Sequence, residues 1–221
     1  MRRPFLSQLT LACVAPLALW QACAPQALAA EPSCCGPISS QGRRVEAVLD
    51  GMNVESLWLA HEHVNWETGA PDKDADYAGP GRSTHCSAFA AAVGKKLGVY
   101  MLRPPEHGQI LLANAQAEWF HAAGGKEKGW REVRTPHEAQ SLANQGNLVV
   151  VVYESPDPHK PGHVAIVRPS HRLERLLEQN GPEITQAGQK NYLKTSTKVG
   201  FQVHPGAWPD GVRYYAHAVG L

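Results

Sequence analysis

Two runs of β-branched residues in the second half of the chain constrain its fold most strongly. Residues 147–153 read NLVVVVY, a continuous apolar run typical of a buried strand. Residues 163–169 read HVAIVRP, and a proline-rich connection separates the two runs. This pattern predicts an antiparallel pair of strands. The segments 181–188 and 212–219 are further strand candidates.

The first half of the chain carries helical patterns instead. Apolar residues recur at helical spacing over residues 42–64, with a break near Gly51. A second helix is predicted over residues 85–97, with Thr84 as its N-cap and Gly98 just beyond its C-terminus.

Two more helices are predicted before the strands begin. One ends at Gly124 and offers five apolar residues to a core: Ile110, Leu111, Ala113, Ala117 and Phe120. The other is short and starts at a capping box formed by Thr135 and Glu138, with proline at its first position. Helices followed by strands predict an α+β domain, with N-terminal helices packed on an antiparallel sheet.

The first 29 residues have the composition of a secretory signal peptide. Arg2 and Arg3 precede a short apolar core over residues 9–20, and Ala27 and Ala29 supply a cleavage site. The apolar core is shorter than the ~20 residues needed to span a bilayer. We therefore expect export to the periplasm or beyond. Lipidation at Cys23 is the alternative for this segment.

Residues 30–44 are expected to form a flexible N-terminal arm and residues 45–221 a single domain. The formal net charge is only +1, which gives no argument for nucleic acid or an anionic membrane surface as a partner. No later segment is long and apolar enough to insert in a membrane. We expect a monomer.

Removal of the leader would leave three cysteines, Cys34, Cys35 and Cys86. Exported cysteines tend to pair, so one alternative is a disulfide from Cys34 or Cys35 to Cys86. Cys86 could otherwise be a small buried core residue, because free cysteine is among the most buried residue types. The third possibility is a reactive thiol.

The position of Cys86 at the start of a predicted helix favours chemistry. The free N–H groups and partial positive charge of a helix N-terminus stabilise a thiolate, and the same donors can hold an oxyanion. His163, at the start of a strand, is the best candidate for its base, although it could instead be an ordinary buried strand histidine. Gln186 is the first candidate to orient His163, with Asn191 or Glu183 as alternatives.

Two motifs resemble a known group of enzymes. The stretch THCSAFAAAVGKKLGV around Cys86 and the stretch PGHVAIV around His163 resemble the cysteine helix and histidine strand of NlpC-type and CHAP-type peptidoglycan hydrolases. The resemblance implies a papain-like core and a cysteine peptidase or amidase that needs no metal or cofactor. In this chain His85 stands where NlpC-type enzymes usually carry aspartate, and Gln186 stands where CHAP-type enzymes usually carry glutamate.

The sequence thus favours a thiol hydrolase that cuts an amide bond in cell-wall peptide. A degenerate binding module and a cysteine-dependent acyltransferase remain as alternatives. Side chains expected to contact the substrate are His85, Ser87, Trp66 and Asn191, and His204 and Trp208 are candidates for an aromatic wall. His61 and His63 suggest zinc only weakly, because no clear third and fourth ligands follow them.

Overall fold

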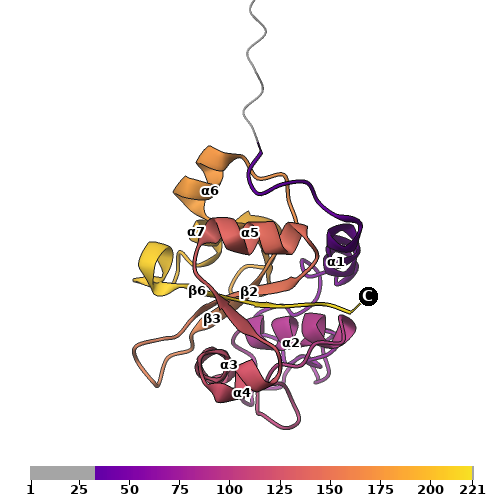
Figure 1. Ribbon diagram of the computed structural model, residues 1–221. Coiled ribbons are helices and arrows are strands. Elements are labelled where there is room, and N and C mark those ends of the chain that lie inside the picture. Colours follow the sequence, from indigo (N-terminus) through magenta and orange to yellow (C-terminus); the bar gives the residue numbers. More distant parts are fainter. Residues whose placement is uncertain (1–32, 221) are drawn as a thin grey trace, which may run out of the picture. The chain divides into compact units, whose positions relative to one another are not determined.

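A computed structural model describes residues 33–220 of the chain (Figure 1). The expected signal peptide, residues 1–29, and the alternative at Cys23 lie outside these described residues. The described residues fold around one antiparallel sheet whose strand order is β1-β6-β2-β3-β4-β5. The strands are β1 (Arg131–Val133), β2 (Leu148–Tyr153), β3 (His163–Val167), β4 (Glu183–Gln186), β5 (Tyr192–Ser196) and β6 (Arg213–His217).

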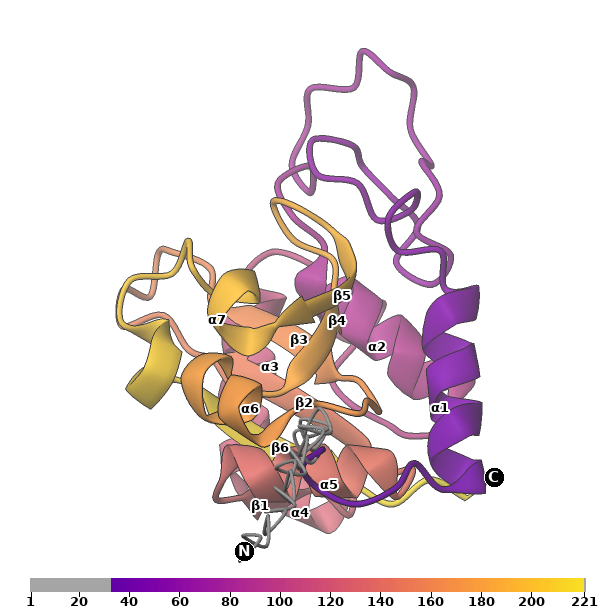
Figure 2. The same cartoon turned by 90° about the horizontal axis from the view of Figure 1, so that it is seen from above.

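Helices cover both faces of this sheet, as Figures 1 and 2 show. The predicted α+β class and antiparallel sheet are confirmed. The helices are α1 (Ser40–Gly51), α2 (Cys86–Lys96), α3 (Leu112–His121), α4 (Ala123–Glu127), α5 (Pro136–Asn144), α6 (Glu174–Asn180) and α7 (Thr197–Gly200), and a single π-type turn spans Ala207–Gly211.

The central strand β2 separates two hydrophobic clusters. Val150 and Val152 pack on one face with residues of α2 and α3. Val149 and Val151 pack on the other face with residues of α5. Successive side chains of a strand point to opposite faces, so a strand buried on both faces must be apolar throughout. The continuous valine run therefore fits the central place of β2 in the sheet.

Local sequence signals set the start and end of two helices. Helix α5 begins at Pro136, and the Thr135 hydroxyl accepts a hydrogen bond from the Glu138 amide at 3.1 Å, as predicted. Gly98, just past α2, has φ +70°, a value that favours glycine at this position. The N-cap of α2 is His85 rather than the predicted Thr84, and its side chain does not cap the helix.

The segment between α1 and α2 differs from the prediction. We expected helical structure to resume after Gly51 and reach residue 64, but residues 52–85 form turns and loops. The buried Trp58 explains this, because it has φ +53° and donates from Nε1 to the Trp66 carbonyl at 3.0 Å. A left-handed residue with a large side chain is incompatible with a continuous helix.

The predicted helix ending at Gly124 is divided in the structure. Its apolar start was also misjudged, because Ile110 is 67% exposed and Leu111 36% exposed. Leu111 has φ +54° and stands outside α3 as its N-cap. Ala113, Ala117 and Phe120 are buried, as expected. The extended backbone at Ala122 separates α3 from α4.

The expected N-terminal arm is packed from Ser33 onward. Ser33 forms an isolated β-bridge with Leu173, and the Cys34 amide donates to the Arg172 carbonyl at 2.7 Å. Helix α1 begins at Ser40, inside the range expected to be flexible, and Ser39 caps it through a hydrogen bond from Gly42 N–H at 2.9 Å. These contacts were not predictable from the mixed composition of the segment.

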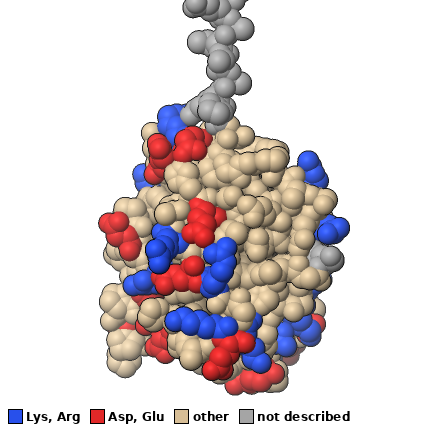
Figure 3. Space-filling view, viewed as in Figure 1, with Lys and Arg blue, Asp and Glu red and all other residues tan. Residues whose placement is uncertain are grey.

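Basic and acidic side chains alternate over the face drawn in Figure 3, which therefore carries no single-sign patch. Among residues 33–220, no helix has the length and apolar character needed to cross a membrane.

Candidate active site

Cys86 is the first residue of α2 and lies beside strand β3. Its side chain is nearly buried, with 4% of the residue exposed, and it is the free cysteine among the described residues. Backbone N–H groups of Val164 and Ser87 approach its sulfur and favour the charged form. Since Val164 follows His163 directly, the sulfur lies at the start of the strand that carries the expected base.

Burial sets the ionisation of this thiol. Loss of solvent raises the pKa of Cys86 above its ordinary value of 9.0, and the backbone hydrogen bonds only partly oppose this effect. The sequence predicted a thiolate stabilised at the helix N-terminus, and this prediction is wrong for the resting protein. The cause is the depth of Cys86, which the sequence pattern does not show.

His163 is held by the predicted third residue. Its Nε2 lies 2.9 Å from Gln186 Oε1, and both residues are buried, at 3% exposure each. Burial lowers the pKa of His163 from 6.5 to about 4, and this effect outweighs the hydrogen bond to Gln186, which raises it. His163 is therefore a neutral imidazole near pH 7.

The Lys190 carbonyl determines which atom of Gln186 faces His163. Gln186 Nε2 donates to the Lys190 carbonyl at 3.1 Å, so the amide oxygen must point to His163. A carbonyl oxygen only accepts, and Nε2 of a neutral His163 must therefore carry the proton. The second ring nitrogen, Nδ1, is left with its lone pair free to act as a base.

Two glycines leave room for this hydrogen bond. A Cβ on Gly200 would lie 2.5 Å from Gln186 Oε1, and a Cβ on Gly188 would lie 3.3 Å from His163 Cε1. Phe201 packs edge-on against the His163 ring, at 4.6 Å between centroids. The absence of side chains at Gly188 and Gly200 thus leaves room for the His163–Gln186 contact, and Phe201 packs against the His163 ring.

Another histidine stacks on His163. The His204 ring lies 5.0 Å from the His163 ring at an interplanar angle of 18°, and its charge would further lower the pKa of His163. His204 is half-buried, and burial lowers its own pKa. The sequence named His204 only as one member of a possible aromatic wall; its stacking on the base was not foreseen.

Asn114 of α3 fixes the turn that leads into His163. Its Oδ1 accepts from Gly162 N–H at 2.7 Å and from Ser155 N–H at 3.2 Å, and its Nδ2 donates to the Lys160 carbonyl at 3.0 Å. Gly162 is required here because a Cβ would lie 2.2 Å from the Tyr153 carbonyl oxygen. Sequence reasoning missed Asn114, since no local pattern links α3 to this turn.

Two cavities meet at the site. The larger, about 570 Å³, is lined by His163, Gln186 and His204 among others. The smaller, about 220 Å³, is lined by Cys86, Ser87 and His85 among others. Thr84 and Pro161 border both cavities. The nucleophile and base candidates therefore face adjoining spaces.

The remaining predicted contacts fall into two groups. His85 and Ser87 line the smaller cavity, where His85 Nε2 lies 2.9 Å from the Glu62 carbonyl oxygen. Trp66 and Asn191 line neither cavity. Trp66 packs against the core with the Lys95 ammonium 5.5 Å from its ring centroid.

Asn191 is a structural tether rather than a cavity residue. Its Nδ2 donates to the backbone carbonyls of Val54, Leu57 and Trp58, at 2.7–3.2 Å, and its Oδ1 accepts from Gly188 N–H at 2.8 Å. It thereby ties the loop after β4 to the segment after α1. Glu183, the other alternative partner of His163, instead lies 3.9 Å from Arg168 Nε.

Only part of the aromatic wall suggested by the sequence lines a cavity. Tyr153 and Tyr192 line the larger cavity with His204, whereas Trp208 lines neither cavity. His63 pairs with Asp72 and does not gather with His61 into a group of three metal-binding side chains. The described residues contain one such group, Cys34, His137 and Glu174, which lies elsewhere in the fold.

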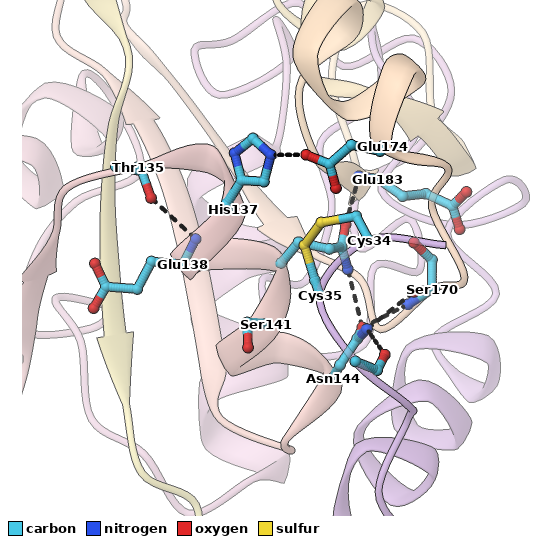
Figure 4. Close-up of a disulfide and its surroundings, with 12 residues drawn as sticks. Cys34, Cys35, Thr135, His137, Glu138, Ser141, Asn144, Ser170, Glu174 and Glu183 are labelled. Carbon is cyan, nitrogen blue, oxygen red and sulfur yellow. Dashed lines mark hydrogen bonds and ion pairs between the residues drawn. A yellow bond between two sulfur atoms is a disulfide. The ribbon is translucent and has the colours of Figure 1, made fainter. Parts of the chain in front are cut away.

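The cysteine pairing differs from the alternative considered from the sequence. Cys34 and Cys35 are joined to each other, and Cys86 is free (Figure 4). A disulfide between adjacent cysteines leaves the nucleophile candidate unbridged.

The sequence matches no protein-family model and none of the curated proteins compared with it.

Proposed function

We propose that this protein is a thiol hydrolase that cleaves an amide bond in peptidoglycan or a related cell-wall peptide. The observation that carries the proposal is the His163 Nε2–Gln186 Oε1 hydrogen bond of 2.9 Å, with Cys86 Sγ at the backbone of the next residue, Val164. This arrangement supplies a nucleophile, a base with a defined tautomer and a group that orients the base.

The proposed reaction starts from a neutral pair. Cys86 Sγ attacks the carbonyl carbon while its proton moves to Nδ1 of His163, and the carbonyl oxygen becomes an oxyanion. In this proposal the Cys86 amide, at the N-terminus of α2, donates to that oxyanion. The protonated His163 then gives its proton to the leaving amine, and a thioester remains on Cys86.

In hydrolysis of the thioester, water is the nucleophile and the Cys86 sulfur is the leaving group. A water molecule gives a proton to Nδ1 and adds to the thioester carbonyl, and the sulfur leaves and recovers the proton. The carboxylic acid product is released. Gln186 contributes by accepting from Nε2–H throughout, which keeps the imidazole plane fixed. A glutamine stabilises the transient imidazolium less than a carboxylate does.

The order of elements supports a papain-like core. A helix that begins at the cysteine packs on a strand that begins at the histidine, and the third polar residue ends the neighbouring strand β4. The sequence motifs around Cys86 and His163 resemble those of NlpC-type and CHAP-type hydrolases. The predicted export of the chain would bring it to a cell-wall substrate.

The test is digestion of purified peptidoglycan. The released fragments are separated and weighed by mass spectrometry for the unaltered protein and for Cys86→Ala. The proposal predicts new amine and carboxylate ends at one kind of amide bond, and their absence with Cys86→Ala. Identical products from both proteins refute it. With an added amine, a product joined to that amine would identify acyl transfer instead.

A second candidate function is a cell-wall binding module without turnover. The specific observation in its favour is the burial of Cys86, which raises the pKa of the thiol and leaves it protonated at rest. This candidate predicts binding of peptidoglycan with no fragments released. Sedimentation with insoluble peptidoglycan, assayed beside the digestion, separates the two functions.

A further inference from the structure

A second cluster of reactive side chains lies on the other side of the sheet from Cys86. It joins three elements that are distant in the sequence: the segment before α1, the first turn of α5 and the start of α6. The side chains are Cys34, His137 and Glu174, and one potential ligand atom of each lies within 4.8 Å of the other two. Figure 4 shows His137 and Glu174 directed at each other, close to the disulfide.

We propose that these three residues form a zinc site that the Cys34–Cys35 disulfide closes. Thiolate sulfur, imidazole nitrogen and carboxylate oxygen are the three ligand types that zinc takes in proteins. Three protein ligands leave the fourth tetrahedral position for water. A site of this composition suits zinc better than magnesium or calcium, which prefer oxygen ligands alone.

Backbone structure fixes the positions of the residues in this cluster. Ser33 pairs with Leu173, and the Cys34 amide bonds to Arg172 at 2.7 Å, so Cys34 is held beside the residue that precedes Glu174. His137 is the second residue of α5. Only small side-chain shifts are needed to bring atoms within 4.8 Å of one another onto a shared ion.

The cluster is also open to an incoming ion. The side chains of His137 and Glu174 are 45% and 44% exposed, whereas Cys34 is 3% exposed. His137 Nε2 and Glu174 Oε1 share a hydrogen bond. Zinc would take the place of the proton between His137 and Glu174, and the buried sulfur of Cys34 would be the third protein ligand.

The bond to Cys35 determines whether Cys34 can bind zinc. While Cys34 is bonded to Cys35, its sulfur cannot act as a thiolate ligand. A dithiol reductant donates two electrons and two protons, which cleave the S–S bond to two thiols and oxidise the reductant to its own disulfide. Zinc binding then releases the Cys34 thiol proton. The oxidised protein is thus the closed form of the site and the reduced protein the open form.

The test uses protein in which the other thiols are removed by Cys13→Ser, Cys23→Ser and Cys86→Ala. Zinc content is measured after gel filtration, before and after reduction with tris(2-carboxyethyl)phosphine. We expect one zinc per chain in the reduced protein and none in the oxidised protein. Cobalt added to the reduced protein should give the thiolate-to-metal absorption of a tetrahedral sulfur-containing site.

Two substitutions make the test specific. His137→Ala should weaken zinc binding at least about tenfold, whereas His121→Ala, an exposed histidine on α3, should leave the affinity unchanged. Cys35→Ser frees Cys34 without any reductant and should bind zinc under oxidising conditions. Equal zinc affinity in His137→Ala and the parent, or no zinc in both the reduced parent and Cys35→Ser, would overturn the proposal.

Discussion

The amide oxygen of Gln186 lies 2.9 Å from Nε2 of His163, and both residues line a cavity of about 570 Å³. A second hydrogen bond, from Gln186 Nε2 to the Lys190 carbonyl, fixes the amide in the orientation that presents its oxygen. This relationship sets the tautomer of His163 and leaves Nδ1 as the base.

Replacing Gln186 should impair catalysis more than binding. We expect Gln186→Ala to lower kcat about 10- to 100-fold with a smaller change in KM, because an untethered imidazole samples unproductive tautomers and orientations. Gln186→Glu should keep the hydrogen bond, stabilise the imidazolium and raise the pKa of His163. Steady-state kinetics and NMR titration of His163 measure these effects. Unchanged kcat in Gln186→Ala contradicts the orienting role.

A methyl group at Gly200 should disrupt the same contact. The added Cβ would lie 2.5 Å from both Gln186 Oε1 and Ile184 Cδ1, so Gly200→Ala should displace the amide and destabilise the fold by about 1–3 kcal/mol. Gly108→Ala is the matched control, since a Cβ there meets no atom within 4 Å. Urea unfolding and the digestion assay report the two effects. Equal stability and equal activity of Gly200→Ala and Gly108→Ala would show that close packing at Gly200 does not hold the Gln186 amide in place.

The burial of His163 should make the protein less stable in acid. The pKa of His163 is 6.5 when exposed and about 4 in the fold, so between these values the unfolded chain binds more protons than the folded one. Its contribution to the free energy of unfolding is constant above pH 6.5, falls as the pH drops to about 4 and is constant below. The loss attributable to His163 is about 3 kcal/mol.

Urea unfolding at a series of pH values measures this loss. His85 and His204 also have pKa values lowered by burial and act in the same direction, so the contribution of His163 is the difference between the parent and His163→Phe. The slope with pH should be shallower in His163→Phe over this window. Parallel curves would mean that His163 is not held neutral by burial.

Cys86 should titrate as a thiol with a raised pKa. Burial is the largest influence on it, so the thiolate should form only above the ordinary value of 9.0. The difference in ultraviolet thiolate absorbance between the parent and Cys86→Ala, followed against pH with Cys34 and Cys35 oxidised, measures this directly. A thiolate signal already present below pH 7 would indicate a resting ion pair with His163 and contradict the neutral pair.

Asn191 should matter for stability and not for substrate contact. Asn191→Ala removes three hydrogen bonds to carbonyls and one from Gly188 N–H, and we expect it to lower the free energy of unfolding by about 2 kcal/mol. KM for peptidoglycan fragments should change little. Lys194→Thr, an exposed change on the following strand, serves as the control for both measurements. A selective rise in KM would restore the substrate-binding role predicted from the sequence.

Patterns with short-range physical causes were readable from the sequence. The valine run predicted the central strand, Thr135 and Glu138 marked the start of α5, and Gly98 marked the end of α2. The hydrogen-bonded partner of His163 was the first of three candidates, because Gln186 stands where the resemblance to CHAP-type hydrolases expects the third polar residue. Each of these rests on neighbours within one or two elements.

Features that depend on tertiary contact were not readable. His204 stacks on His163, and Asn114 accepts a hydrogen bond from Gly162 N–H. In both cases the two residues are more than 40 positions apart in the sequence. The ionisation of Cys86 was predicted in the wrong direction, because a helix N-terminus favours a thiolate only where the burial cost is smaller. Depth in the fold, and not position in the helix, decides that pKa.

The most direct test of the central claim is covalent labelling of Cys86 by a peptide electrophile that carries a cell-wall stem-peptide sequence. Intact mass and peptide mapping give the rate and the site of labelling in the parent and in His163→Ala. If Nδ1 of His163 takes the thiol proton, one adduct should form on Cys86, and its rate should fall at least about 100-fold in His163→Ala. Equal rates in the two proteins would contradict the account.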